Sequence, residues 1–149
     1  MKGKTVLLSI LALLAFSCDQ TLQPTSLIGT WELIASTSTE KGKTVSTFDP
    51  KRKMIKIINP THFAFLNHDI STATDSAATP FSAGGGKYTL AGNVYTEYLD
   101  YFTDKRWEGN KFEFTVNLLN DTLIQRGVEK VEKLNVDHIL IETYKRVNQ

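Results

Sequence analysis

Short apolar segments separated by turn residues recur along the chain from Leu27 onward, and this spacing limits the possible folds most strongly. The segments follow one another roughly every 8 to 15 residues, and none is a long stretch with the 3.6-residue period of an amphipathic helix. Nine segments are expected to be strands, namely 30–37, 44–48, 53–58, 62–67, 86–90, 94–102, 111–118, 122–126 and 138–147. The pattern predicts an all-β fold, either a barrel or a sandwich.

The segment 111–118 shows the pattern most clearly. Phe112, Phe114, Val116 and Leu118 alternate with polar residues, which indicates one buried face and one face in water. Residues 27–149 are enough for one domain with one core and too few for two. Two connections are longer than a hairpin turn: 68–80, expected as a loop that covers a barrel mouth, and 127–137, expected to hold a short helical turn.

The N-terminus has the layout of a secretory signal peptide. Lys2 and Lys4 form a basic start, residues 6–16 are apolar, and Ser17 precedes the only cysteine of the chain, Cys18. The apolar run is too short for a membrane-spanning helix, which needs about 20 residues. An ordinary cleaved signal peptide remains the alternative to the lipoprotein leader described next.

This start resembles a bacterial lipoprotein leader that ends in an acylated cysteine. The resemblance implies that residues 1–17 are removed, that Cys18 carries the lipid, and that residues 18–26 form a polar tether. It places the protein in the bacterial cell envelope, on the outer membrane or at the cell surface, with the membrane as its partner through Cys18. Two or more acyl chains are needed for stable anchoring.

Charge and cysteine content exclude other classes of protein. The chain has 17 Lys and Arg against 16 Asp and Glu, and removal of residues 1–17 leaves 15 against 16. A nearly neutral domain without a basic stripe does not predict binding to nucleic acid. A single cysteine forms no internal disulfide, and acylation removes a reactive thiol.

The segment after the tether contains a Gly-x-Trp motif, Gly29-Thr30-Trp31. Together with the stretches 53–65, 84–97 and 120–123, it resembles the lipocalin-like (calycin) domain of small bacterial lipoproteins. This resemblance implies an antiparallel up-and-down β-barrel of about 8 to 10 strands. The resemblance implies that Gly29 allows a close approach of the backbone and that Trp31 closes one end of the barrel. It also implies that Arg146, or alternatively Lys145, lies over the indole ring.

Five residues are candidates for contact with a ligand inside such a barrel. Glu97 lies among aromatic residues, where an inward carboxylate would pair with a cation such as Lys56. Tyr88 and Tyr95 would offer aromatic surface with a polar tip, and His62 would orient a polar group. A structural ion pair and ordinary core packing are the alternatives for these residues.

The sequence contains no pattern of catalytic residues, no metal-ligand spacing and no cofactor motif. We therefore expect a protein that is not an enzyme and whose barrel binds a small hydrophobic or amphipathic molecule. The alternative is a filled barrel that serves as an interaction or structural module and contacts another envelope protein. An eight-stranded barrel is compatible with both.

Overall fold

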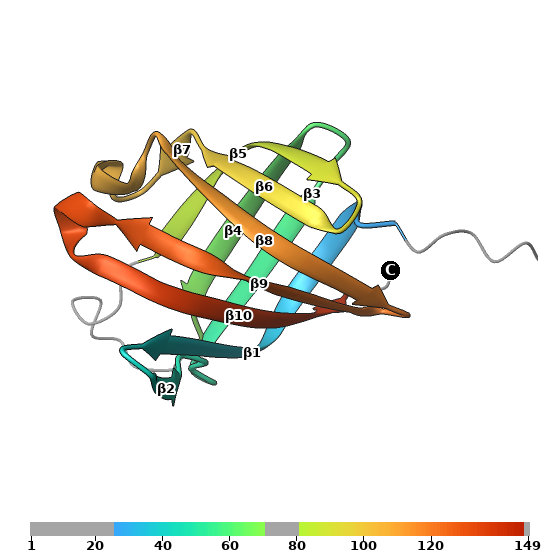
Figure 1. The fold of residues 1–149 in the computed structure, drawn as a ribbon. Coiled ribbons are helices and arrows are strands. Elements are labelled where there is room, and N and C mark those ends of the chain that lie inside the picture. Colours follow the sequence, from blue (N-terminus) through green and yellow to red (C-terminus); the bar gives the residue numbers. More distant parts are fainter. Residues whose placement is uncertain (1–25, 71–80, 148–149) are drawn as a thin grey trace, which may run out of the picture.

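The computed structural model describes residues 26–70 and 81–147, and these form an all-β structure. Eight strands make a closed antiparallel barrel, and two further strands lie outside it (Figure 1). The expected fold class is therefore confirmed. The barrel strands in sheet order are β1 (Gly29–Glu40), β3 (Arg52–Ile58), β4 (His62–Asp69), β5 (Ser82–Ala91), β6 (Val94–Leu99), β8 (Asn110–Leu119), β9 (Thr122–Val131) and β10 (Val136–Arg146).

Pairing between the first and the last barrel strands closes the sheet. The register runs from Trp31 opposite Arg146 to Thr39 opposite Ile139, with an irregularity between Leu33 and Ala35. The outer strands are short: β2 (Lys43–Ser46) pairs with β1, and β7 (Tyr101–Phe102) pairs with β5. Closure leaves no long free sheet edge along the barrel.

The predicted segment 94–102 is divided into β6 and β7. Tyr88 pairs with Glu97, whereas Gly84 pairs with Phe102, so the register along β5 shifts by one residue at this point. A side chain at Gly86 would collide with the backbone of Tyr98. The glycine therefore allows the bulged strand to approach closely.

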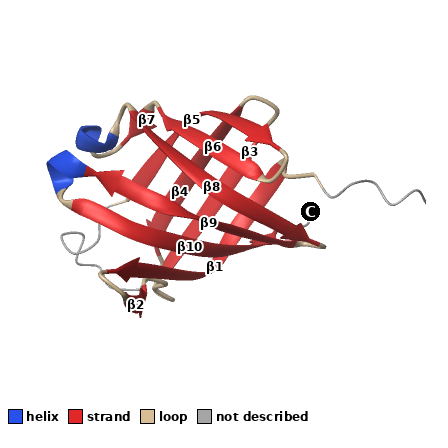
Figure 2. Cartoon of the chain, in the orientation of Figure 1, coloured by secondary structure: helices blue, strands red, loops and turns tan. Residues whose placement is uncertain are grey.

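Two short 3-10 turns, η1 (Lys105–Trp107) and η2 (Glu132–Leu134), lie at the same end of the barrel (Figure 2). The expected helical turn within 127–137 is present as η2, but β9 and β10 take up most of that segment. The expected loop 68–80 begins with the end of β4, and its residues 71–80 lie outside the described residues, as do residues 1–25 with Cys18.

The opposite end of the barrel is closed by Trp31, which is fully buried. Its indole Nε1 donates to the carbonyl of Leu27 at 2.9 Å, and the guanidinium carbon of Arg146 lies 4.1 Å from the ring centroid. Arg146 also donates to the carbonyls of Ile28 at 3.0 Å and Ser26 at 2.6 Å. The structure thus places Arg146, and not Lys145, over the tryptophan.

Gly29 has a backbone φ of +149°, and a Cβ at this position would come within 2.5 Å of Arg146 Nη1. Glycine suits this position because its positive φ would strain any other residue, and because the guanidinium group of Arg146 passes directly beside the backbone. Above this closed end, large side chains such as Ile58, Phe63, Phe114, Leu123 and Tyr144 fill the barrel. Within ranges 26–70 and 81–147, no helix is long and apolar enough to cross a membrane.

Candidate functional site

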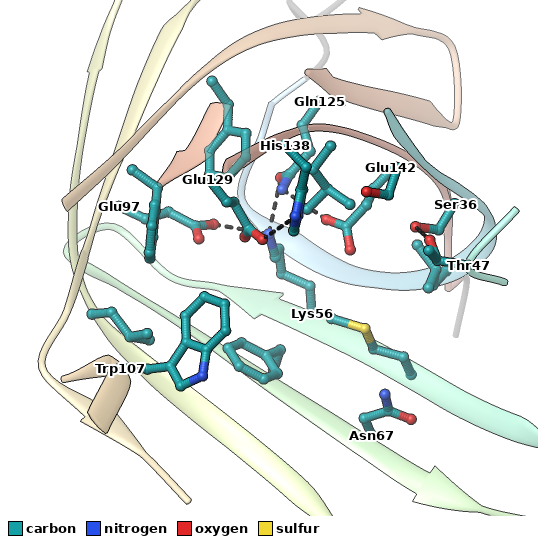
Figure 3. Close-up of a pocket in the computed structure, with 18 of the residues that line it drawn as sticks. Ser36, Thr47, Lys56, Asn67, Glu97, Trp107, Gln125, Glu129, His138 and Glu142 are labelled. Carbon is teal, nitrogen blue, oxygen red and sulfur yellow. Dashed lines mark hydrogen bonds and ion pairs between the residues drawn. The ribbon is translucent and has the colours of Figure 1, made fainter. Parts of the chain in front are cut away.

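The half of the barrel nearer to η1 contains a cavity of about 350 Å³ (Figure 3). One part of its wall is apolar, made by Leu33, Met54, Phe65, Leu99, Phe102, Trp107, Phe112, Phe114 and Leu140. The other part is polar, made by Ser36, Ser38, Thr47, Lys56, Asn67, Glu97, Gln125, Glu129, His138 and Glu142. The barrel is therefore filled at one end and hollow at the other.

Lys56 lies at the centre of the polar wall. Its Nζ donates to Glu97 Oε1 at 2.8 Å and to Gln125 Oε1 at 2.9 Å. Lys56 is 2% exposed and Glu97 is 7% exposed, so this ion pair is shielded from water. The expected pairing of these two residues is confirmed, whereas their contact with a ligand stays a prediction.

The polar network continues from Gln125 to β10. Gln125 Nε2 donates to Glu142 Oε2 at 2.8 Å, and the hydroxyl of Tyr144 donates to the same oxygen at 2.7 Å. Burial raises the pKa of the Glu142 carboxyl, and the nearby charge of Lys56 opposes this effect. None of the described residues donates a hydrogen bond to the other oxygen of this carboxyl group, Oε1.

A second pair, between Glu129 of β9 and His138 of β10, lies nearer the η1 end. The distance between Glu129 Oε2 and His138 Nε2 is 3.1 Å. Burial, followed by the charges of Glu142 and Glu97, raises the pKa of Glu129 to about 7, although Lys56 acts in the opposite direction. This carboxyl group therefore changes its charge near neutral pH.

Aromatic rings also line the cavity, and two of them, Phe65 and Phe112, are the direct cross-strand neighbours of Lys56 and Glu97. The ring centroids of Phe65 and Phe102 are 5.5 Å apart, those of Phe102 and Trp107 are 6.0 Å apart, and those of Trp107 and Phe112 are 6.2 Å apart. Trp107 comes from η1 and so reaches the cavity from outside the barrel strands. This continuous apolar surface suits a flat or aliphatic group.

Only two of the five predicted ligand-contact residues, Lys56 and Glu97, line the cavity. Tyr88 lies closer to the filled end, where its hydroxyl donates to the carbonyl of Asn59 at 2.8 Å and its ring packs on Tyr95 at 5.2 Å. His62 is exposed, and its Nδ1 contacts the hydroxyl of Thr61 at 2.8 Å. The inward place on this part of β4 belongs to Phe63, because neighbouring residues of a strand face opposite sides.

Tyr95 is fully buried beneath the polar network. Its hydroxyl group has no hydrogen-bond partner within the described part of the chain. Burial and the adjacent Glu97 raise the pKa of this hydroxyl strongly, so Tyr95 stays neutral. It belongs to the packed layer on which the Lys56 pair rests.

Sequence reasoning did not identify Gln125, Glu129, His138, Glu142 and Trp107 as site residues. Strand alternation was the available signal, because residues an even number of positions apart share a face of a strand. Gln125 and Glu129 are two and six residues after the buried Leu123, and Glu142 is two residues before the buried Tyr144. Within residues 26–70 and 81–147, no group of three or more His, Cys, Asp or Glu side chains is arranged to hold a metal ion. No model of a protein family matches this chain, and no curated protein matches it at a significant level.

Proposed function

We propose that this protein binds one small amphipathic molecule in the cavity of its barrel and does not act as an enzyme. The observation that carries the proposal is the cavity itself, which joins an aromatic wall to a buried polar network. Its volume of about 350 Å³ lies at the lower end of the range usual for small-molecule sites, and such sites combine an apolar lining with a few polar groups. The ligand is therefore expected to be small.

The cellular setting forms a second part of the proposal. Acylation of Cys18 would hold the barrel at a membrane of the bacterial cell envelope, because the leader 1–17 resembles that of a lipoprotein. A filled barrel that acts only through its outer surface is the competing function. The hollow half of the barrel favours ligand binding over that alternative.

Native mass spectrometry of the purified chain, after incubation with a lipid and metabolite extract, tests the binding function. We expect a reproducible adduct that is lost in Leu140→Trp, because Leu140 lines the cavity and a larger side chain would fill it. Val128→Trp is the matched control, because Val128 lies on the outside of β9 and is 51% exposed. The proposal fails if no extract yields an adduct or if Leu140→Trp retains it.

A further inference from the structure

We infer that the ligand of this cavity is a small amphipathic cation, an alkylamine or arylamine whose ammonium group pairs with Glu142 and Glu129. This inference rests on the proposed binding function and names the chemical class of the ligand. It follows from the balance of charges and of hydrogen-bond donors in the cavity wall. The apolar part of the cavity lining then decides what the rest of the ligand resembles.

Acidic groups outnumber basic groups around the cavity. Glu97, Glu129 and Glu142 all contribute carboxyl groups, whereas Lys56 is the one Lys or Arg among the described residues of the lining. Lys56 already donates to Glu97 and Gln125. His138 adds a positive charge only when it is protonated. The cavity therefore holds more carboxyl groups than basic groups to pair with them. Burial raises the pKa of Glu142, and a bound cation would favour its ionised form.

Glu142 shows this excess in its hydrogen bonds. The residue is 8% exposed, and both donors that reach it, Gln125 and Tyr144, use the same oxygen, Oε2. The second oxygen, Oε1, receives no donor from the described side chains or backbone, although Glu142 lines the cavity. A buried carboxylate without full compensation is costly, so a donor that brings a positive charge would be strongly favoured here.

An anionic ligand fits this site poorly. The head group of a fatty acid would add a negative charge beside three carboxyl groups and would find Lys56 already paired. A neutral alcohol would donate a hydrogen bond to Glu142 but would not neutralise its charge. An ammonium group does both.

The aromatic wall fits the other part of such a ligand. Trp107 and the carboxyl groups of Glu129 and Glu142 border the same space (Figure 3). The faces of Trp107, Phe102 and Phe112 offer apolar contact, and an indole face also attracts a cation. A molecule with an ammonium group and a small apolar body would satisfy both surfaces at once.

Cation binding would also be linked to pH. Four groups face Glu129 from the strands around it, namely His138 and Glu142 of β10, Glu97 of β6 and Lys56 of β3. A bound ammonium favours the ionised form of Glu129 and expels its proton, so the affinity rises with pH through the pKa of about 7.

Isothermal titration calorimetry with matched probes tests this inference. The probes are 2-phenylethylamine, 2-phenylethanol and 3-phenylpropanoate, with octylamine, octanol and octanoate as an aliphatic set. At pH 8 we expect the amines to bind at least tenfold more tightly than the alcohols and the carboxylates not to bind. Lowering the pH from 8 to 6 should weaken amine binding severalfold and leave alcohol binding unchanged.

Glu142→Gln and Glu129→Gln keep the shape of each side chain and remove its charge. We expect each to weaken amine binding by tenfold or more while alcohol binding changes less than twofold. Glu113→Gln, on the outer face of β8, should alter neither. Equal binding of amine and alcohol, or an extract adduct that is neutral or anionic, overturns the cation assignment and leaves the binding function standing. The absence of any probe or extract ligand overturns both.

Discussion

The two ends of the barrel each hold a basic side chain against an aromatic ring, yet they differ in what surrounds it. At the closed end, Arg146 lies on Trp31 and donates to the backbone carbonyls of Ile28 and Ser26. In the hollow half, Lys56 is set among carboxyl groups, and Glu142 keeps an oxygen without a donor from the described residues. The donor groups of Arg146 find acceptors at the closed end, whereas an acceptor oxygen of Glu142 finds no donor from the described residues in the hollow half. This difference distinguishes a structural closure from a site for a ligand.

The largest effect is expected from removing the plug of the closed end. Trp31→Ala should lower the free energy of unfolding by about 3 to 5 kcal/mol, because it leaves a large cavity in a packed core. Urea unfolding followed by circular dichroism measures this. Trp107→Ala should cost clearly less stability, since Trp107 is only half-buried at the cavity, and it should weaken ligand binding instead. Equal stability losses in the two variants would contradict the contrast between the ends.

The next largest effect concerns the buried ion pair. Lys56→Met should cost about 3 to 4 kcal/mol of unfolding free energy, because Glu97 is left as an unpaired buried charge. The double variant Lys56→Met/Glu97→Met should recover much of this loss, as measured by urea unfolding. Lys53→Met, an exposed position on the same strand, should change stability by less than about 0.5 kcal/mol. A Lys56→Met variant as stable as the wild type would show that the pair is not shielded.

The ionisation of Glu129 in the hollow half is expected to make the free energy of unfolding depend on pH. Its pKa is raised to about 7 in the fold, so folding favours the neutral carboxyl group. The contribution is full below the ordinary pKa of the unfolded chain and is lost as the pH rises through about 7, up to about 3 kcal/mol. Glu129→Gln should therefore match the wild type near pH 4 and exceed it in stability above pH 7.

Urea unfolding of both proteins between pH 4 and pH 8 measures this difference. Glu113→Gln serves as the control, because this glutamate lies on the exposed face of β8. Parallel stability curves for the wild type and Glu129→Gln would show that Glu129 keeps an ordinary pKa.

The smallest effect tests the geometry of the closed end. Arg146→Lys keeps the positive charge but replaces the planar group that donates to two carbonyls and stacks on Trp31. We expect a loss of about 1 to 2 kcal/mol in unfolding free energy, with ligand affinity unchanged. Lys145→Met, on the neighbouring exposed position, should have almost no effect. A changed ligand affinity in Arg146→Lys would mean that the two ends are coupled.

Much of the fold was predictable from local sequence signals. Each of the nine expected segments overlaps a strand, although 44–48 extends beyond the end of β2 and 138–147 extends beyond the end of β10. The alternation of Phe112, Phe114 and Val116 correctly identified the inward face of β8. The boundaries were less accurate: β9 extends to Val131, and the one-residue shift opposite Gly86 divides the segment 94–102. Such boundaries depend on the neighbouring strand, which local patterns do not specify.

The candidate site was predictable only in part. The sequence offered an inward Glu97 that pairs with Lys56 as one interpretation, and the structure confirms this pair. The contacts of Gln125 with both Lys56 and Glu142 join three strands. His138 reaches Glu129 in the register of β9 with β10, and Trp107 enters from η1.

The sequence by itself determined the all-β class, many of the turns and the alternation of inward and outward residues along strands such as β8, while the leader that ends at Cys18 stays a prediction. These features depend on the two-residue period of a strand, on turn chemistry and on the order of residues along the chain. Only the tertiary structure decided that one half of the barrel is hollow and that three carboxyl groups meet there. The physical reason is closure: the pairing of β10 with β1 and the stagger of the strands determine which inward side chains share a level of the barrel.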